Sequence, residues 1–311
     1  MCELSVIILT YNHEKFIDEA INSVINQITN FDFEIIIGDD CSKDRTIDIV
    51  KTYAKRVKNF KFITHSQNVG TTMNLCDCLE ASNAEYFTYF GGDDYWINNF
   101  KLQKQYDFLK SNFDYLGVCN KIRAIDFDKK ISVTYPREQI IKEGISLKGF
   151  MKGRTFPISG VLVKNISKFQ NWNNLKEVIL TDRLIEDFSL SLILLDIGKI
   201  AVIDEILAVY RIRSSELNAQ NYNSIVSFND KYLQHIKLYS KLKCYYPNLN
   251  FNYFILLKIN ELFFYCLRRR IMNNFYEEYI KINPILRIIF ILQLPIRTIS
   301  VIINAIRKQM I

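Results

Sequence analysis

The sequence feature that most constrains the fold is an alternation between short apolar runs and segments with helical periodicity. Residues 4–9 (LSVIIL) form one continuous apolar run, and residues 33–40 (FEIIIGDD) contain another. Between them, apolar residues recur at helical spacing over residues 14–27. Continuous apolar strands alternating with helices are typical of α/β proteins whose parallel sheet is buried on both faces.

The alternation continues through the next fifty residues. It predicts a helix over residues 46–57 and a strand over residues 61–65. After a turn at residues 68–70, it predicts a second helix over residues 71–81 and a second strand over residues 84–90. Ligands of such sheets bind at the carboxyl ends of the strands. Polar residues stand at these predicted ends: Asn12, Asp39, Asp40, Asp93 and Asp94.

The rest of the chain has a different pattern. Residues 116–215 mix short strands with one apolar helix, whereas residues 216–311 are helical, aromatic and basic. We therefore predict one domain over residues 1–215, with a nucleotide-binding half over about 1–115 and an acceptor-side half over about 116–215. A helical appendage over residues 216–311 follows it.

Composition excludes several other classes of protein. The seven cysteines are scattered and include no CxxC pair, which argues against a disulfide framework or a zinc site and favours a reducing cytosol. No apolar run reaches the roughly 18 residues of a membrane-spanning helix, and the chain does not begin like a secretory signal. The net charge of +7 comes without a nucleic-acid recognition motif.

The acidic pair in YFGGDDYW carries the clearest chemistry. Asp93 and Asp94 follow an apolar strand directly, where carboxylates can hold Mn²⁺ or Mg²⁺ against phosphate oxygens. Gly91 and Gly92 allow a sharp turn and the close approach of a diphosphate. The alternative for such a sequence is a solvated acidic turn.

Four motifs in order, SVIILTYN, EIIIGDDCSKDRT, HSQNVG and EYFTYFGGDDYW, resemble the amino-terminal half of family 2 inverting glycosyltransferases of the bacterial cell-surface polysaccharide type. The segment IEDFSLSLILLDIGKIAVIDEILAVYRIR is similar to the one that carries the family's catalytic base. This resemblance covers about two thirds of the chain. It implies the GT-A fold, in which helices flank a Rossmann-like nucleotide-binding sheet.

The resemblance also implies roles for individual residues. Asp40 matches the partner of a uracil-type imide, and Asp93 matches a metal ligand, with Asp94 beside it. The family's first acidic position falls on Gly91, so the usual pair of carboxylates is incomplete. The predicted nucleotide-binding residues are Thr10, Tyr11, Asn12, Asp40, Gly92, Asp93, Arg211 and Arg213.

Asp187 matches the catalytic base, and Glu186 is its neighbouring rival. The alternative is that both carboxylates only stabilise a helix amino terminus. For Arg211 and Arg213, contact with phosphate competes with ordinary surface charge. Trp96 and Ser159 are predicted on the acceptor side, although a packed core aromatic is the alternative for Trp96.

The predicted function is metal-dependent, inverting transfer of a sugar from a UDP- or dTDP-sugar to a glycan or lipid-linked acceptor in cell-surface polysaccharide synthesis. A nucleotidyltransferase or another metal-assisted phosphoryl enzyme also needs clustered aspartates. A non-catalytic nucleotide-sugar or glycan-binding protein is a further alternative. The sequence contains neither GxGxxG nor GxxxxGK[ST], which argues against dinucleotide and P-loop sites.

The last segment, residues 281–311, carries five basic residues and no acidic one: Lys281, Arg287, Arg297, Arg307 and Lys308. A wide apolar face opposite a narrow polar stripe predicts a helix lying on the inner face of the cell membrane. The protein would then be cytoplasmic and peripheral. Packing of this helix on the protein's own core, or in an oligomer, is the alternative.

Overall fold

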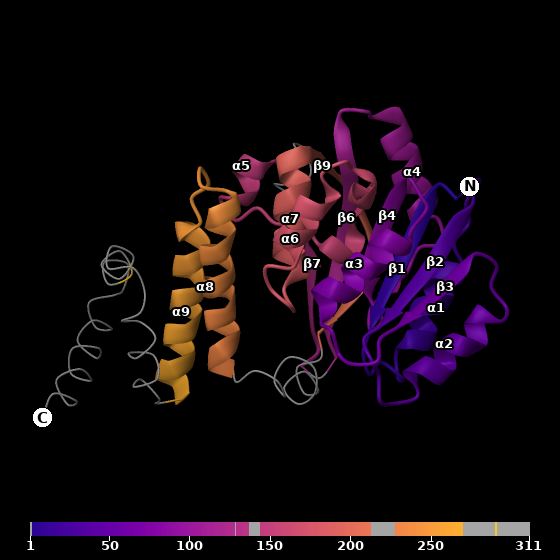
Figure 1. The fold of residues 1–311 in the computed structure, drawn as a ribbon, viewed down its shortest axis with the longest axis horizontal. Helices are drawn as coiled ribbons and strands as arrows, with labels where there is room; N and C mark the ends of the chain where they lie inside the picture. Colours follow the sequence, from indigo (N-terminus) through magenta and orange to yellow (C-terminus); the bar gives the residue numbers. More distant parts are fainter. Residues whose placement is uncertain (1, 128, 137–143, 213–227, 270–289, 291–311) are drawn as a thin grey trace, which may run out of the picture. The chain divides into compact units, whose positions relative to one another are not determined.

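The computed structural model describes residues 2–127, 129–136, 144–212, 228–269 and 290 (Figure 1). The chain forms two compact units, residues 1–221 and 222–311. The first unit is built around one sheet with strand order β3-β2-β1-β4-β8-β6-β9-β5, with β7 paired to β6. The strands are β1 (Leu4–Thr10), β2 (Phe33–Asp39), β3 (Phe60–Thr64), β4 (Tyr86–Gly91), β5 (Tyr95–Trp96), β6 (Tyr115–Asp126), β7 (Ile131–Tyr135), β8 (Leu162–Lys164) and β9 (Lys199–Ile212).

The four strands β1 to β4 pair in parallel, as the continuous apolar runs predict. Strand β1 is buried along its whole length and lies between β2 and β4. The chain therefore adds β2 and β3 on one side of β1 and β4 on the other. Such a change of side is the topological switch point at which open α/β sheets bind ligands.

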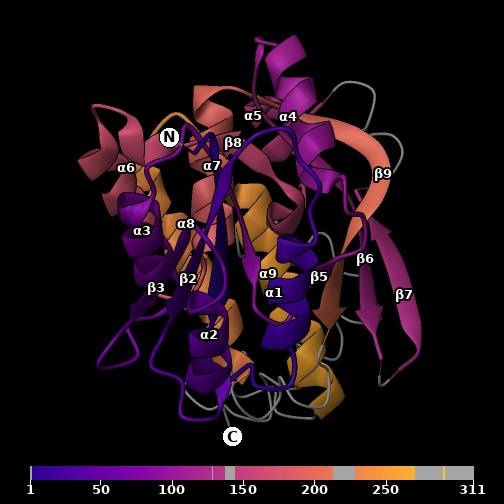
Figure 2. The ribbon, with the colours of Figure 1, turned by 90° about the vertical axis from the view of Figure 1, so that its right-hand side faces the viewer.

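Helices cover both faces of these parallel strands. Within the described residues, the helices of the first unit are α1 (Ile17–Ile25), α2 (Thr46–Ala54), α3 (Thr71–Ala81), α4 (Lys101–Ser111), α5 (Leu147–Phe150), α6 (Trp172–Ile179) and α7 (Glu186–Ile197), with short 3₁₀ turns η2 (Ile158–Gly160) and η3 (Ile166–Lys168). Helices α1 and α2 lie in front of β1 to β3 in Figure 2, and α3 packs on the opposite face. Leu4, Val6 and Ile8 join the side chains of α1 and α2 in one apolar cluster.

Helix α3 approaches β2 closely because of one glycine. A Cβ at Gly38 would lie 2.2 Å from Asn74 Oδ1 and 2.5 Å from Cys78 Sγ, so no other residue fits here without movement of α3. The Asn74 side chain donates to Gly38 O at 2.8 Å. This contact fixes α3 over the strand that ends at Asp39.

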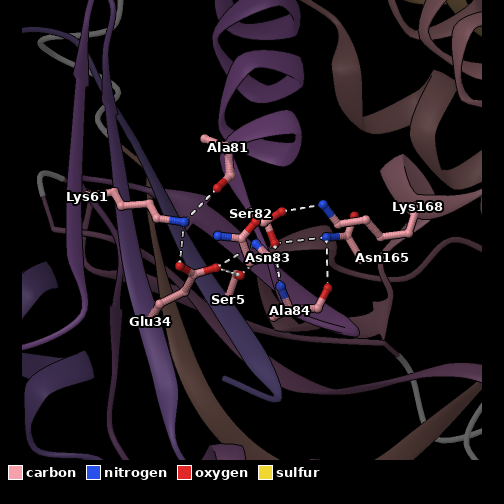
Figure 3. A network of polar contacts seen from close by, with 9 residues as sticks. All are labelled: Ser5, Glu34, Lys61, Ala81, Ser82, Asn83, Ala84, Asn165 and Lys168. Carbon is pink, nitrogen blue, oxygen red and sulfur yellow. Dashed lines mark hydrogen bonds and ion pairs between the residues drawn. The ribbon is translucent and has the colours of Figure 1, made fainter. Parts of the chain in front are cut away.

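A polar network ties the strands together where they begin (Figure 3). Glu34, which is 5% exposed, accepts from Ser5 Oγ at 2.6 Å and lies 2.8 Å from Lys61 Nζ. Ser82 Oγ lies 2.7 Å from Ser5 Oγ and accepts from Asn165 Nδ2 at 2.8 Å. The network joins the first three strands to the end of α3 and to the start of η3, at the opposite ends of the strands from Thr10 and Asp39.

Among the strands predicted in residues 116–215, β9 is one long strand that pairs in parallel with β6. In the second unit, helices α8 (Phe228–Tyr245) and α9 (Asn252–Arg269) pack through Tyr239 and Phe254, whose ring centroids lie 5.6 Å apart. Within the described residues, no helix has the length and apolarity needed to cross a membrane. The predicted membrane-binding helix in residues 281–311 lies outside them, apart from Phe290.

Candidate functional site

Three strand ends meet at the switch point. Thr10 pairs in register with Asp39, and Leu9 pairs with Gly91, so β1, β2 and β4 end at the same edge of the sheet. The structure thereby brings together the acidic pairs that lie more than fifty residues apart in the sequence. Their arrangement depends on the turns that follow each strand.

The GGDD turn is held by backbone hydrogen bonds. Asp94 N donates to Gly91 O at 2.9 Å, and Gly92 N donates to Leu9 O at 2.8 Å. A Cβ at Gly92 would lie 2.9 Å from Ile17 Cδ1 and 3.1 Å from Thr10 Oγ1, so a larger residue here would require these side chains to shift. Among the described residues, the buried Thr10 hydroxyl has no hydrogen-bond partner, which leaves it available to a ligand.

Asp93 and Asp94 have different surroundings. The Asp93 side chain is 18% exposed, and its Oδ2 lies 3.9 Å from His13 Nε2. Asp94 is 4% exposed and accepts from the backbone N–H of Arg211 at 2.9 Å. Asp93 therefore faces the site, whereas Asp94 also supports β9.

The residues at this turn fit a divalent cation only if a ligand completes its coordination. Within the described part of the chain, no group of three or more His, Cys, Asp or Glu side chains is placed to hold a metal ion. Mg²⁺ is commonly bound by one or two carboxylates together with substrate phosphates and water. The carboxylate of Asp93, with Asp94 beside it, matches that kind of site.

Arg211 crosses from β9 to the GGDD turn. Its Nη1 donates to Asp93 O at 3.0 Å, and its Nη2 lies 2.5 Å from Glu19 Oε2. The guanidinium carbon is 5.0 Å from the centroid of the Phe16 ring and 4.6 Å from that of Tyr95. Arg211 thus holds the turn in place in this structure, while Arg213 lies outside the described residues.

Asp39 and Asp40, at the end of β2, also differ from each other in their contacts. Asp39 is fully buried and accepts from Ser42 N at 2.9 Å and from Ser42 Oγ at 2.5 Å, which makes it a turn-forming residue. Asp40 accepts from Val69 N at 2.6 Å and from Gly70 N at 3.0 Å. Burial raises the pKa of Asp40, and the two amide hydrogen bonds act against that rise.

The loop after β1 is fixed by the loop after β2. Asn12 adopts a left-handed conformation with φ of 55°, and its Oδ1 accepts from Lys43 N at 2.8 Å. Its own N–H donates to Ser42 Oγ at 2.9 Å. Tyr11, between Thr10 and Asn12, is half-buried. These contacts fix the backbone of the loop at Asn12.

The predicted base and its rival stand at the start of α7. Asp187 is exposed, and Glu186 is half-buried. Burial and the neighbouring Asp187 carboxylate raise the pKa of Glu186 above its ordinary value. Both carboxylates lie near Tyr89 of β4, since together with burial they raise the pKa of that phenol. The two residues therefore approach the sheet beside the strand that ends in the GGDD turn.

Trp96 is a packed core aromatic, which was the alternative interpretation of its sequence position. It is 5% exposed, and its ring centroid lies 5.0 Å from that of Phe90. Lys101, which is fully buried, places its Nζ 4.2 Å from the Trp96 ring and donates to Gln105 Oε1 at 2.7 Å. Gln105 in turn donates to Gly160 O at 2.7 Å, directly after the buried Ser159.

Three residues of the site were missed by the sequence analysis: His13, Glu19 and Arg183. Arg183 donates to Asn68 Oδ1 at 2.5 Å across a separation of 115 residues. Glu19 meets Arg211 across 192 residues. Only His13 carried a local signal, because it follows the polar strand end at Asn12.

Comparison with known proteins gives consistent matches. A family model described as glycosyl transferase family 2 matches residues 5–164. An uncharacterized protein of Mycobacterium tuberculosis is 34% identical over 134 residues, which are 43% of this chain and 39% of that protein. The poly(ribitol-phosphate) beta-N-acetylglucosaminyltransferase TarS of Staphylococcus aureus is 35% identical over 112 residues, 35% of this chain and 19% of TarS. The matched segments thus span less than half the length of either relative.

Solved structures show the same fold. A crystal structure of residues 1–349 of S. aureus TarS in complex with UDP-GlcNAc superposes with a TM-score of 0.59 at 21% identity, covering 96% of this chain and 83% of that one. The mannosyltransferase PcManGT of Pyrobaculum calidifontis, in complex with GDP-Man and Mn²⁺, gives a TM-score of 0.55 at 12% identity, covering 100% of this chain and 81% of that one.

Proposed function

We propose that this chain, which belongs to glycosyl transferase family 2 and has the predicted GT-A fold, transfers a sugar from a UDP- or dTDP-sugar to a cell-surface glycan or lipid-linked acceptor. One observation supports the proposal: Asp40 and Asp93 follow β2 and β4, the two strands that flank β1 at the switch point, and Glu186 and Asp187 lie near Tyr89 of β4. A nucleotide would lie along that edge, with its base toward Asp40 and its diphosphate toward Asp93.

Transfer would proceed by one in-line displacement. The acceptor hydroxyl oxygen forms a bond to the anomeric carbon while the bond from that carbon to the diphosphate breaks, which inverts the configuration. Asp187 takes the hydroxyl proton, because it is exposed at the helix start. Glu186 is the weaker candidate, since its raised pKa keeps it protonated over more of the pH range.

The proposal includes dependence on Mn²⁺ or Mg²⁺, held by Asp93 with Asp94 beside it. When bound, the cation supplies positive charge opposite the leaving diphosphate. The Mn²⁺ in the PcManGT complex supports this part of the proposal. Asp93 would orient the diphosphate, and Gly92 places no side chain in the tightly packed turn beside it.

The proposal extends to the location of the protein in the cell. We place the enzyme in the cytoplasm, peripheral on the inner face of the membrane through residues 281–311, where a lipid-linked acceptor is available. The cell-wall polymer acted on by TarS, poly(ribitol phosphate), supports a surface-polymer acceptor class.

The test is a screen of nucleotide sugars with and without Mn²⁺ or Mg²⁺. Release of nucleoside diphosphate from a uridine or thymidine donor is expected. Release of pyrophosphate from a nucleoside triphosphate and a sugar phosphate would instead show nucleotidyl transfer. Binding of donors without any turnover, even with acceptors present, would show a binding protein.

A further inference from the structure

Arg183, three residues before the start of α7, wraps its side chain around the turn at residues 68–70. Its Nε donates to Val69 O at 3.2 Å, and its Nη2 donates to Asn68 Oδ1 at 2.5 Å and also to Asn68 O. A guanidinium has several donors in one rigid plane, so it can hold three acceptors of one turn at once.

The turn also holds the backbone of Arg183. Arg183 O accepts from Thr72 Oγ1 at 2.9 Å and from Thr72 N at 3.3 Å. Gly70 has φ of 91°, and a Cβ there would lie 2.3 Å from Arg183 Cγ and 2.6 Å from Arg183 O. Both the conformation and the contact require glycine. Two segments more than a hundred residues apart are thus interlocked in both directions.

The two sides of this turn face different parts of the site. On one side, Val69 N and Gly70 N donate to the Asp40 carboxylate. On the other, Arg183 is followed by a fixed backbone, because Asp182 Oδ1 accepts from Leu184 N at 2.8 Å and from Ile185 N at 3.1 Å. Helix α7 then begins with Glu186 and Asp187.

We propose that Arg183 is a positioning residue that couples occupancy of the Asp40 end of the site to the placement of Asp187. The inference rests on the proposed function, because it takes Asp40 to contact the nucleotide base and Asp187 to accept the proton. A nucleotide bound at Asp40 restrains the 68–70 turn, and the turn restrains the start of α7 through Arg183. Coupling of this kind is reciprocal, so loosening the link weakens nucleotide binding as well as catalysis.

The first experiment compares Arg183→Ala with a matched control, Arg56→Ala. Arg56 is also exposed, and its Nε donates to a backbone carbonyl, Thr52 O, at 3.0 Å. For Arg183→Ala we expect donor KM to rise roughly tenfold and kcat to fall roughly tenfold, because an error of an ångström in catalytic geometry is costly. Arg56→Ala should change neither. Arg183→Lys, which keeps the positive charge but loses the planar guanidinium with its several donors, should give intermediate values of KM and kcat.

The pH dependence of UDP binding by Arg183→Ala distinguishes a change at Asp40 from a general loss of folding. Burial raises the pKa of Asp40, while the amide hydrogen bonds from Val69 and Gly70 and the charges of His65 and Arg183 lower it. Removal of the Arg183 charge should therefore raise the pKa of Asp40, and the acid limb of UDP binding should move to higher pH. The limb should not move in Arg56→Ala.

The second experiment measures the coupling itself by amide hydrogen exchange with UDP alone. In the wild type, UDP should increase protection at residues 182–187 as well as at residues 68–72. In Arg183→Ala the increase should be confined to residues 68–72. Thr72→Val, which removes one hydrogen bond to Arg183 O, should weaken the response at residues 182–187 and serves if Arg183→Ala does not fold.

Two outcomes separate the inference from the proposed function. If the wild type binds UDP and turns over a donor while Arg183→Ala matches Arg56→Ala in kinetics, pH profile and exchange, the coupling is overturned and the function stands. If the wild type neither binds UDP nor releases nucleoside diphosphate, the proposed function fails, and the coupling fails with it.

Discussion

The Asp94 carboxylate supports the backbone of β9, since its Oδ1 accepts from Arg211 N at 2.9 Å. Asp93, one residue earlier, lies 3.9 Å from His13 and is the more exposed of the two. Adjacent aspartates that look equivalent in the sequence therefore differ in structure. The difference gives each a separate experimental signature.

Asp93→Ala should abolish divalent-cation-dependent release of nucleoside diphosphate while leaving the unfolding temperature near that of the wild type. Asp94→Ala should instead lower the free energy of unfolding by about 1–3 kcal/mol, because it leaves a buried backbone N–H unsatisfied. Thermal unfolding and a donor turnover assay measure both effects. An Asp93→Ala enzyme with full activity, or a wild type active in excess chelator, would remove the metal from the mechanism.

Asp187→Asn should keep donor affinity but lose about 10²–10⁴ in kcat, because an amide of the same shape cannot accept the proton. Glu186→Gln is the matched control at the adjacent position and should retain most activity. Single-turnover kinetics with saturating donor separate binding from chemistry. If Glu186→Gln is inactive and Asp187→Asn is not, the base is Glu186.

The same control has a predicted effect on stability. Burial raises the pKa of Glu186 above its unfolded value, so the folded state binds more protons between the two values and wild-type stability falls as pH rises through that window. Glu186→Gln removes this fall. Its advantage over the wild type should therefore grow with pH, by at most about 1.4 kcal/mol per pH unit. Urea unfolding at several pH values measures it, and a constant difference would contradict the assigned pKa.

Asp40→Ala should weaken UDP binding by about tenfold or more and reduce the preference between bases, because the base loses the carboxylate that would accept its imide proton. The loss should appear mainly in KM, with a smaller fall in kcat because the Asp40 carboxylate also holds the 68–70 turn. Calorimetric titration with uridine, guanosine and adenosine diphosphates measures the preference. Unchanged affinity for UDP in a folded variant would leave Asp40 with only its bonds to Val69 and Gly70.

The parallel half of the fold was predictable because its strands are short, apolar and separated by regular helices. Helix α4 was not predicted, since its buried face includes Lys101 and Gln105, which a hydrophobic pattern assigns to solvent. Strand β6 was missed for a similar reason: polar Asn120 and Lys121 interrupt its apolar run. Hydropathy cannot show that a buried amide such as that of Gln105 donates to carbonyls of β6 and η2.

The candidate site likewise contains residues that the sequence pattern predicts and residues that it does not. Residues at strand ends, such as Asp40 and Asp93, are visible in the sequence because each closes its own apolar run. The side chains that position them come from distant segments: Arg211 contacts Asp93 O across 118 residues. Local sequence patterns do not predict contacts between such distant residues. The contacts of Arg183 and Glu19 are therefore visible only in the three-dimensional structure.

The basic segment at residues 281–311 gives a prediction about membranes. The full chain should float with liposomes that contain anionic lipid at low salt, and a chain ending at Ile280 should not, because cations beside an apolar face bind anionic headgroups. Added salt should weaken flotation. Equal binding of both chains, or unfolding of the shorter one, would assign the segment to the protein's own packing.

The network around Glu34 predicts a pH-dependent loss of stability far along the strands from the chemistry (Figure 3). Burial alone would raise the pKa of Glu34, but hydrogen bonds from Lys61, Ser5 and Asn83 hold it below its ordinary value. The carboxylate therefore stabilises the fold at pH values above its unfolded pKa of about 4.3, and this contribution is lost as the pH falls through the folded pKa.

Glu34→Gln should accordingly lower the free energy of unfolding by about 1–3 kcal/mol near neutral pH, because Lys61 loses its partner, and the difference from wild type should shrink in acid. Glu85→Gln is the matched control: Glu85 pairs with Lys110 at 3.8 Å but is 59% exposed, so its loss should cost less than about 1 kcal/mol. Urea unfolding of the three proteins at neutral and acid pH makes the comparison. Activity per folded molecule should stay at the wild-type level in both variants, since Glu34 lies at the start of β2 and Asp40 follows its other end. A Glu34→Gln deficit that is the same at both pH values would show that shape, and not charge, holds the network together.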